Sequence, residues 1–287
     1  MPDAATSVYG IIGNPVRHSF SPVMHNSAFA KVGINAVYVA FEVNNLHQAI
    51  DGIRGLEICG VSVTIPHKIS VIPLLDEVEE IADMIGSVNT IINRNGNLIG
   101  TNTDAYGFYR ALSEKISIDG KTVAVLGSGG ASRAICFALF HYAKPKKVLL
   151  FAARPEDTEQ ARELSGNVSS KIDNSDISAV SLSDWSKYKN DIEIVINTTP
   201  LGMHPLEDLS PLKENDFDER MTVMDIVYNP HQTRFLSIAL EKGCNICYGI
   251  DMLLYQGIRQ FELWTNSKAP VDVMRKVLTE RINKAKK

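Results

Sequence analysis

The chain has 287 residues, of which 45% are apolar, 22% charged and 7% aromatic, so it can bury an ordinary core and is long enough for two domains. Its formal net charge of -4, with acidic and basic residues mixed along the chain, excludes the basic surface that nucleic-acid binding needs. No apolar run is long enough to span a membrane and the opening residues lack the order of a signal peptide, so we expect a cytoplasmic protein.

The first part of the chain, residues 7–100, alternates short β-rich runs with helical patterns. Helices are predicted from Ser21, as a serine cap followed by Pro22 in the first turn, and from Asn45. Alternation of strands and helices implies an α/β domain with a mostly parallel sheet. The predicted strands are residues 8–13, 36–41 and 60–64.

A second domain is predicted after the helical stretch 105–115, because residues 122–126 form the continuous apolar run of a buried parallel strand. Further strands follow at intervals that leave room for crossover helices, which is typical of a Rossmann-type sheet. These strands are residues 147–151, 192–196 and 223–227.

The third part, from Asn245 onward, is mainly helical and is expected to return to the first domain. The predicted substrate-binding domain is therefore discontinuous, with residues 1–104 and 245–287, and the dinucleotide-binding domain comprises residues 105–244. Cys244 and Cys247 have the spacing of a metal or redox pair, but no second pair accompanies them. We expect buried structural thiols there and no metal site.

The segment VLGSGGASRA, residues 125–134, lies between a predicted strand and a predicted helix. Gly127 would allow the tight turn and Gly129 the close approach of a pyrophosphate, which the amides of the next helix would face. The third fingerprint position is Ser132, which is small enough for close helix packing. The predicted dinucleotide-binding loop comprises Gly127, Ser128, Gly129, Gly130 and Ala131.

The end of the second Rossmann strand indicates which dinucleotide is bound. An acidic residue there would bind the ribose 2′-hydroxyl of NAD. Residues 151–154 instead read FAAR, and no acidic residue occurs before Glu156. Arg154 therefore favours the 2′-phosphate of NADP.

Seven motifs, in this order, resemble the signatures of shikimate dehydrogenases, and the resemblance spans residues 8–265. The ordered set is far more specific than any one of its members. The motifs are GNPVRHSFSP (13–22), VTIPHK (63–68), SVNT (87–90), GTNTD (100–104), NTTPLGM (197–203), DIVYNP (225–230) and QG (256–257).

The resemblance implies a small-molecule substrate, shikimate or 3-dehydroshikimate, interconverted with NADPH in aromatic amino acid biosynthesis. Its carboxylate would lie between the hydroxyls of Ser19 and Ser21, which suits a carboxylate's need for donors. The ring hydroxyls would be bound by amide, ammonium and carboxylate groups. The remaining substrate residues implied are Thr64, Lys68, Asn89, Asp104, Tyr228 and Gln256.

Alcohol oxidation needs a group that takes the hydroxyl proton as hydride leaves, and the reverse reaction needs a proton donor. Lys68 is predicted to take and give this proton. Asp104 is predicted to orient both Lys68 and the reacting hydroxyl. The nearby His18, His25 and His67 are interpreted as packing or supporting residues, and they are not spaced as a metal site. The remaining predicted cofactor residues, besides the loop and Arg154, are Thr199, Ile226 and Gly249.

Two departures from the family pattern affect these expectations. Ala153 and Pro155 flank Arg154 where NADP-binding members commonly carry Asn and Thr, which predicts weaker NADP selectivity. Ala105 follows Asp104 where glycine is common. A quinate/shikimate dehydrogenase that uses NAD and a non-catalytic NADP-binding regulatory protein stay open as alternatives, as do a monomer and a homodimer.

Overall fold

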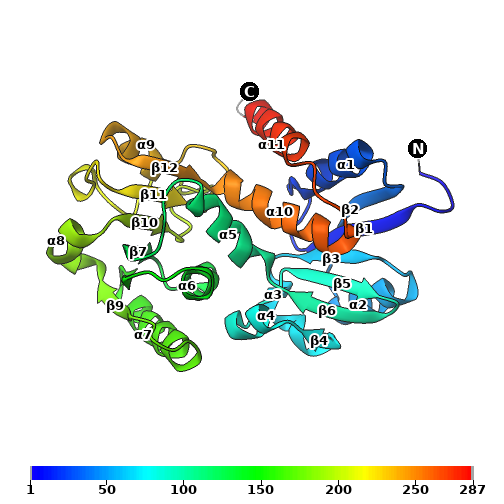
Figure 1. Cartoon of the computed structure of the whole chain (residues 1–287), viewed down its shortest axis with the longest axis horizontal. Coiled ribbons are helices and arrows are strands. Elements are labelled where there is room, and N and C mark those ends of the chain that lie inside the picture. Colours follow the sequence, from blue (N-terminus) through cyan, green and yellow to red (C-terminus); the bar gives the residue numbers. More distant parts are fainter. Residues whose placement is uncertain (1, 286–287) are drawn as a thin grey trace. The chain divides into compact units, whose positions relative to one another are not determined.

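A computed structural model describes residues 2–285 and divides the chain into two compact units (Figure 1). The first unit comprises the residues up to Asp104 and those from Gln256 onward, and the second comprises Ala105–Tyr255. Helices α5 (Thr103–Ser113) and α10 (Gly249–Thr265) each contain residues of both units. The ends of the predicted first domain, residues 1 and 286–287, lie outside the described residues.

The return to the first unit was predicted at Asn245, and the structure places it at Gln256. The difference arises because β12 (Asn245–Tyr248) pairs in parallel with β11 (Thr222–Asp225) and so belongs to the second sheet. Cys244 and Cys247 are buried free thiols, as predicted, and they donate to Asp218 O and Ala111 O respectively.

The first sheet has the strand order β2-β1-β3-β5-β6-β4. Strand β5 is antiparallel to both of its neighbours, whereas the other pairings are parallel, which confirms a mostly parallel α/β sheet. The strands are β1 (Ser7–Gly13), β2 (Ala36–Glu42), β3 (Gly60–Val63), β4 (Glu77–Val78), β5 (Thr90–Arg94) and β6 (Asn97–Thr101). The helices are α1 (Ser21–Val32), α2 (Leu46–Gly55), α3 (His67–Ser70), α4 (Glu80–Ile85) and α11 (Val271–Ala285), with the 3-10 helix η1 (Ile72–Leu74).

Alternation along the strands gives this sheet two buried faces. On one face, Ile12 and Val61 pack with Ile50 and Ile53 of α2 in a single apolar cluster. On the other, aromatic rings of α1 and α10 pack against Tyr9, whose ring centroid lies 5.5 Å from that of Trp264. Gly60 leaves room for this indole, because a Cβ there would lie 2.3 Å from Trp264 Nε1.

Helix α1 begins one residue earlier than a serine cap at Ser21 requires. Phe20 occupies the N-cap position and makes no side-chain cap hydrogen bond, so the predicted cap is wrong. Ser21 is instead the first helical residue and is buried. Pro22 lies in the first turn, as predicted.

The second sheet has the order β12-β11-β10-β7-β8-β9 and all of its pairings are parallel, which is a Rossmann-type topology. Its other strands are β7 (Thr122–Leu126), β8 (Lys147–Ala152), β9 (Ile177–Ser181) and β10 (Ile194–Asn197). Its helices are α6 (Gly130–Tyr142), α7 (Pro155–Lys171), α8 (Trp185–Tyr188) and α9 (Arg234–Glu241), with the 3-10 helices η2 (Leu182–Asp184), η3 (Lys189–Asp191) and η4 (Glu214–Asp216).

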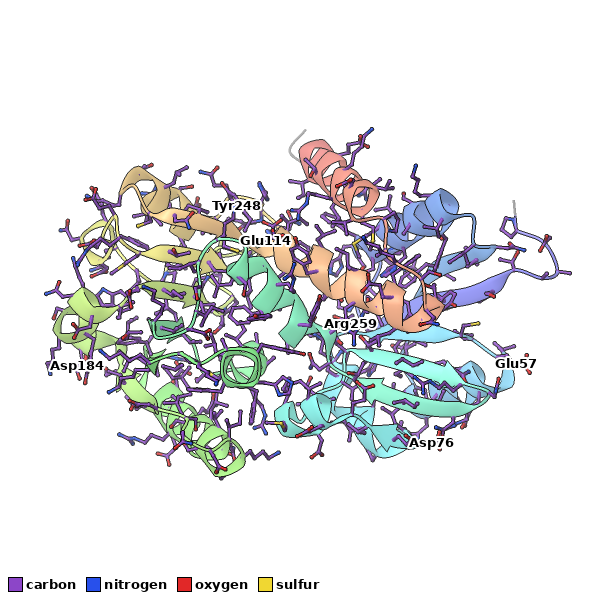
Figure 2. All side chains as sticks on the ribbon, in the orientation of Figure 1. Glu57, Asp76, Glu114, Asp184, Tyr248 and Arg259 are labelled. Carbon is purple, nitrogen blue, oxygen red and sulfur yellow. The ribbon has the colours of Figure 1, made fainter. Side chains whose placement is uncertain are left out.

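Helices pack on this second sheet around its apolar strands. Trp185 of α8 and Phe235 of α9 join strand residues in one buried cluster, while α6 contacts β7 and α7 contacts β8 and β9. The Tyr255 hydroxyl of α10 donates to the carboxylate of Glu114. Glu114 follows α5 and is labelled in Figure 2. Within residues 2–285, no helix combines the length and apolar character that crossing a bilayer would require.

Candidate active site

Most of the predicted substrate residues of the first unit lie on segments at one end of its sheet, where β1 and β3 terminate. We call this end the edge of the sheet. The loops after β1 and β3 are joined there, because Asn14 N–H donates to Ile65 O at 2.9 Å. Since β5 runs antiparallel to β3 and β6 antiparallel to β5, the start of β5 and the end of β6 lie at this same edge. Asn89 just precedes β5 and Asp104 just follows β6, so the topology brings both to these loops.

Lys68 and Asp104 form an ion pair at this edge. Lys68 Nζ lies 2.6 Å from Asp104 Oδ2, and the two side chains are 32% and 19% exposed. Lys68 lies in α3, and Asp104 in the first turn of α5. An ammonium group held by a half-buried carboxylate, with solvent access on the outer side, is suited to give a proton to an oxygen placed beside it.

Asn89 is buried and its amide is held in one orientation. Its Oδ1 accepts from Thr103 N–H at 2.7 Å and from the Thr90 hydroxyl at 2.7 Å. Its Nδ2 donates to Thr103 Oγ1 at 3.1 Å, which uses one of two N–H groups. Asn89 therefore has a donor left to offer a ligand, whereas its acceptor is already engaged.

A buried chain of hydrogen bonds extends from Asn89 toward α1 through Gln260. Gln260 Nε2 donates to Thr90 Oγ1 at 2.9 Å, and Gln260 Oε1 accepts from Ser62 Oγ at 2.9 Å. Ser62 in turn accepts from the Tyr38 hydroxyl at 2.6 Å. The chain therefore joins Asn89, just before β5, to Tyr38 of β2. Sequence reasoning did not single out Gln260.

The remaining substrate residues of the first unit lie on the same loops. Ser21 N–H donates to Ser19 Oγ at 3.2 Å, so the two serines are adjacent. Thr64 follows β3, and a Cβ on Gly13 would lie 2.3 Å from its methyl group, which explains a glycine at that position. The structure thus brings Ser19, Ser21 and Thr64 to the loops that meet Lys68.

Gln256 and Tyr228 complete the predicted substrate set. Gln256 is buried in α10, and its neighbour Gly257 lies against α1, where a Cβ would meet the Met24 side chain. Tyr228 belongs to the second unit and follows β11. The first unit therefore assembles the predicted substrate residues apart from Tyr228.

Of the three histidines near these motifs, two are buried and one is exposed. His25 is fully buried and stacks on Tyr38, with ring centroids 4.5 Å apart, and burial lowers the pKa of His25 to about 3. His67 Nε2 lies 3.0 Å from Val43 O, and His18 is exposed. Across residues 2–285, no group of three or more His, Cys, Asp or Glu side chains could hold a metal ion.

The predicted cofactor residues lie at the carboxyl ends of the second sheet's parallel strands. The glycine-rich loop follows β7, Arg154 follows β8, Thr199 follows β10, and Ile226 and Gly249 follow β11 and β12. The strand order reverses between β7 and β10, and ligands of doubly wound sheets bind at such a point. These residues are far apart in sequence, but all of them follow the carboxyl ends of the parallel strands and so lie at the same end of the sheet.

Gly127 makes the tight turn at this reversal. Its φ of 110° lies in the region that favours glycine, and a Cβ would lie 2.9 Å from Thr198 Oγ1 and 3.1 Å from Thr199 Cγ2. The next helix, α6, begins without a side-chain cap, so its first amides are not occupied by one. A loop of this shape fits a pyrophosphate.

Asp225 fixes the loops after β10 and β11. Its carboxylate is fully buried and accepts from Asn197 Nδ2 at 3.0 Å and from Thr233 Oγ1 at 2.6 Å. Asn197 Oδ1 in turn accepts from the Thr199 hydroxyl at 2.7 Å. Burial raises the pKa of Asp225 to about 6, against the hydrogen bonds that lower it. Gly249 packs on this region, where a Cβ would lie 2.6 Å from Ile226 O.

Arg154 is exposed and engaged with neighbouring carboxylates. Its Nε and Nη2 each donate to Asp157 at 2.8 Å, and its Nη1 lies 3.4 Å from Glu156 Oε1. A guanidinium group after the second strand is the group that a 2′-phosphate needs, so with the Gly127 loop the residues fit NADP.

Two pockets lie in the second unit. One, of about 250 Å³, lies beside the glycine-rich loop, between Ser128, Gly129 and Gly130 and the α7 residues Gln160 and Asn167. Sequence reasoning missed these α7 neighbours, because the polar helix gives little indication of which face it turns to α6. The Ser128 hydroxyl donates to Gln160 Oε1 at 3.4 Å, which could only be found from the fold.

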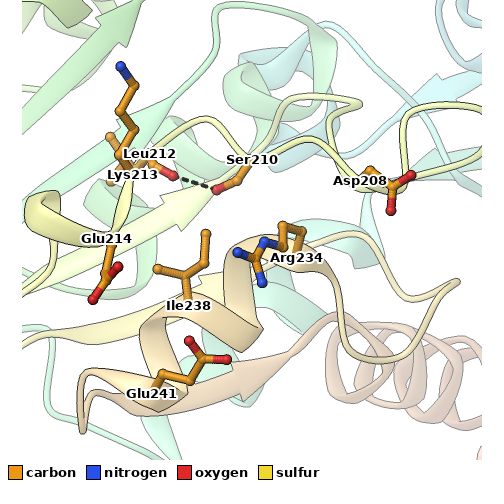
Figure 3. A pocket seen from close by; sticks show the side chains of 8 residues that line it. All are labelled: Asp208, Ser210, Leu212, Lys213, Glu214, Arg234, Ile238 and Glu241. Atoms are coloured by element: carbon orange, nitrogen blue, oxygen red, sulfur yellow. Dashed lines mark hydrogen bonds between the residues drawn. The ribbon is translucent and has the colours of Figure 1, made fainter.

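The other pocket, of about 290 Å³, mixes cations and carboxylates (Figure 3). Arg234 lies between opposing acidic side chains in this pocket, and its charged lining residues are all exposed. Such a balance of exposed charges favours no particular ligand. The charged residues that line it are Asp208, Lys213, Glu214, Arg234 and Glu241.

Comparison with known proteins agrees with this arrangement. Residues 11–91 match the family described as "Shikimate dehydrogenase substrate binding domain", and residues 249–279 match "Shikimate 5'-dehydrogenase C-terminal domain". A shikimate dehydrogenase (NADP(+)) from Methanococcus maripaludis is 42% identical over 287 residues, covering 98% of this chain and 99% of that protein.

Solved structures are similar over nearly the whole chain. The Listeria monocytogenes shikimate 5-dehydrogenase in complex with shikimate and NAD is 35% identical, with a TM-score of 0.90, and the match covers 96% of this chain and 98% of that one. The Thermus thermophilus shikimate 5-dehydrogenase with NADP(H) and shikimate is 32% identical, with a TM-score of 0.84, covering 96% and 99%. The chain therefore belongs to the shikimate dehydrogenase family.

Proposed function

We propose that this protein is an NADP-dependent shikimate dehydrogenase, which reversibly reduces 3-dehydroshikimate to shikimate in aromatic amino acid biosynthesis. Family membership over nearly the full chain supports the activity, and relatives named for NADP(+) support the cofactor. The observation that carries the chemistry is the ion pair between Lys68 and Asp104 at 2.6 Å. The first unit is the substrate domain, and the second is the dinucleotide domain.

Bound NADPH supplies the hydride for reduction of the ketone. Lys68, protonated in its ion pair with Asp104, gives a proton from Nζ to the carbonyl oxygen as that oxygen becomes an alkoxide. In the reverse direction, Lys68 as the neutral amine takes the proton of the substrate hydroxyl. Asp104 keeps Lys68 and the hydroxyl aligned by accepting hydrogen bonds from both.

The other predicted residues bind and orient the substrate. Ser19 and Ser21 donate to its carboxylate, and the free N–H of Asn89 donates to a ring hydroxyl. Thr64, Gln256 and Tyr228 complete this set. On the cofactor side, residues 127–131 would hold the pyrophosphate and Arg154 would bind the 2′-phosphate, and Thr199, Ile226 and Gly249 would complete the cofactor set.

The test follows absorbance of reduced nicotinamide with the purified full-length protein. NADP reduction with shikimate is the expected result. Faster reduction of NAD with quinate would replace the proposal by the quinate activity. Nucleotide binding without turnover on either substrate would instead identify a non-catalytic NADP-binding protein.

A further inference from the structure

We propose that Asp157 is a cofactor-selectivity residue, which lowers the preference of this chain for NADP over NAD by occupying Arg154. The inference rests on the proposed function and extends it, because it concerns how strongly the two dinucleotides are distinguished. A bidentate carboxylate–guanidinium pair at the place where the 2′-phosphate would bind carries it.

The local fold places Asp157 against Arg154. Arg154 has an extended backbone, with φ of -120° and ψ of 157°, and occupies the N-cap position of α7. Asp157 follows in the first turn of that helix, one turn along on the same side. Its carboxylate is 20% exposed, whereas the Arg154 side chain is 66% exposed, so the acid supports the guanidinium from the protein side.

The hydrogen bonds use the edge of Arg154 that a phosphate would use. A guanidinium group binds carboxylates and phosphates best through two parallel N–H donors. Nε and Nη2 of Arg154 both donate to Asp157, at 2.8 Å each. A 2′-phosphate must therefore displace the carboxylate or bind at the outer edge of the guanidinium, close to the carboxylate's negative charge.

The charges near Arg154 oppose a dianion. One guanidinium faces two carboxylates, Asp157 and Glu156, the second at 3.4 Å from Nη1. The hydrogen bonds from Arg154 lower the pKa of Asp157, so this acid is ionised at neutral pH. A 2′-phosphate meets this repulsion, whereas the neutral 2′-hydroxyl of NAD does not.

The residues on either side of Arg154 do not compensate. Ala153 has no polar side-chain atom, and Pro155, at the start of α7, has no backbone N–H to donate. Arg154 is thus the residue of this turn that would bind the 2′-phosphate. Its hydrogen bonds to Asp157 therefore directly affect how strongly that phosphate binds.

Asp157 also has a plain structural use, because an acidic residue in a first turn stabilises a helix. Glu156 also lies in the first turn of α7, so this use does not require Asp157. A stabilising role alone would change the unfolding temperature of an Asp157 variant and leave the ratio of the two dinucleotide affinities unchanged. Selectivity is therefore the measurement that separates the two roles.

The experiment titrates NADPH and NADH into the full-length protein and follows nicotinamide fluorescence, without substrate. We compare wild type, Asp157→Asn and, as a control, Glu159→Gln, which removes the same charge from an exposed position of the same helix. Asp157→Asn is expected to lower the Kd for NADPH about tenfold, because one charge facing a dianion at close range is removed. The Kd for NADH and both constants of Glu159→Gln should stay within about twofold.

Two further outcomes separate this inference from the proposed function. An unchanged or higher Kd for NADPH in Asp157→Asn, with wild type binding NADPH, overturns the inference and leaves the function standing. A wild-type protein that binds neither nucleotide overturns both. Arg154→Gln provides the second variant: it should weaken NADPH binding and leave NADH binding unchanged, and equal weakening of the two would also overturn the inference.

Discussion

Lys68 Nζ lies 2.6 Å from Asp104 Oδ2, although 36 residues separate them along the chain. The pair joins α3 to the start of α5, and both residues reach it from loops at one edge of the first sheet. An ion pair this accessible adds little to stability, since surface pairs contribute about 0 to 1 kcal/mol. Its geometry suits the proton transfer that we propose for Lys68.

Replacing Lys68 with Ala is therefore expected to reduce kcat by about a hundredfold to ten-thousandfold, because the proton donor is lost. NADPH affinity, measured by fluorescence titration, should stay within about twofold. Lys121→Ala is the matched control, since Lys121 also forms a 2.6 Å ion pair, with Glu193. Normal turnover in Lys68→Ala would refute the role assigned to this lysine.

Replacing Gln260 with Leu removes the central link of the buried chain between Ser62 and Thr90. Both hydroxyls lose a partner in a site without water access, so we expect a loss of about 2 to 4 kcal/mol in the free energy of unfolding. Urea denaturation measures it. Gln48→Leu, at an exposed position of α2, is the control and should change stability by less than about 0.5 kcal/mol. An equal loss of stability in Gln260→Leu and Gln48→Leu would show that the hydrogen bonds of Gln260 do not stabilise the fold.

Gly127 and Gly129 separate turn formation from cofactor binding. Gly127→Ala places a side chain at a φ of 110° and within 2.9 Å of Thr198 Oγ1, so it should cost about 1 to 3 kcal/mol of stability. A Cβ on Gly129 meets no atom within 4 Å, so Gly129→Ala should keep its unfolding temperature and weaken NADPH binding, because the pyrophosphate needs that space. Thermal unfolding and nucleotide titration, read together, check both. The assignment of the loop fails if Gly129→Ala binds NADPH as wild type does.

The buried carboxyl of Asp225 predicts a pH dependence of stability. Its pKa is raised from 3.8 to about 6 in the folded protein, so the folded state holds a proton there that the unfolded state releases. The stabilisation is fully present below about pH 4 and is lost as the pH rises through about 6. Between about pH 4.5 and 7.5, wild type should lose about 2 kcal/mol that Asp225→Asn does not lose. Parallel pH profiles for the two proteins in urea denaturation would contradict this.

The sequence was most informative about apolar strands. Residues 122–126 were predicted as a buried strand and form β7 with the same bounds, because a continuous apolar run has one stable place in a parallel sheet. The three strands predicted after it were found with shifts of one or two residues, which is ordinary for strand ends. Their spacing also predicted a Rossmann-type sheet, although it gave no strand order.

Short and polar elements were missed for identifiable reasons. The β5–β6 hairpin turns at Asn95 and Gly96, whose φ angles are 55° and 90°, and an Asn-Gly pair between apolar runs is the signal that would have found it. β9 carries two serines in five residues and shows little apolar patterning. The cap at Ser21 failed because the helix begins one residue earlier, with Phe20 at the N-cap position and Ser21 as the first helical residue.

Site residues could be named from motifs, but their contacts could not. Spacing along the chain gives no sign that Lys68 meets Asp104, since the contact depends on the order of strands in the sheet. Nor does it indicate that Gln260 orients Asn89 through Thr90. Hydrogen bonds between distant segments are set by the fold, and only the fold displays them.

The discontinuity of the first unit has a consequence for how the chain folds as it is synthesised. The second unit is one uninterrupted segment, Ala105–Tyr255, whereas the first unit needs Gln260 and Trp264, which leave the ribosome only after that whole segment. Domains fold as units when their residues become available. The first unit is therefore completed only after the second unit has been made, and until then β1 and β3 emerge without α10, whose Trp264 packs on Tyr9.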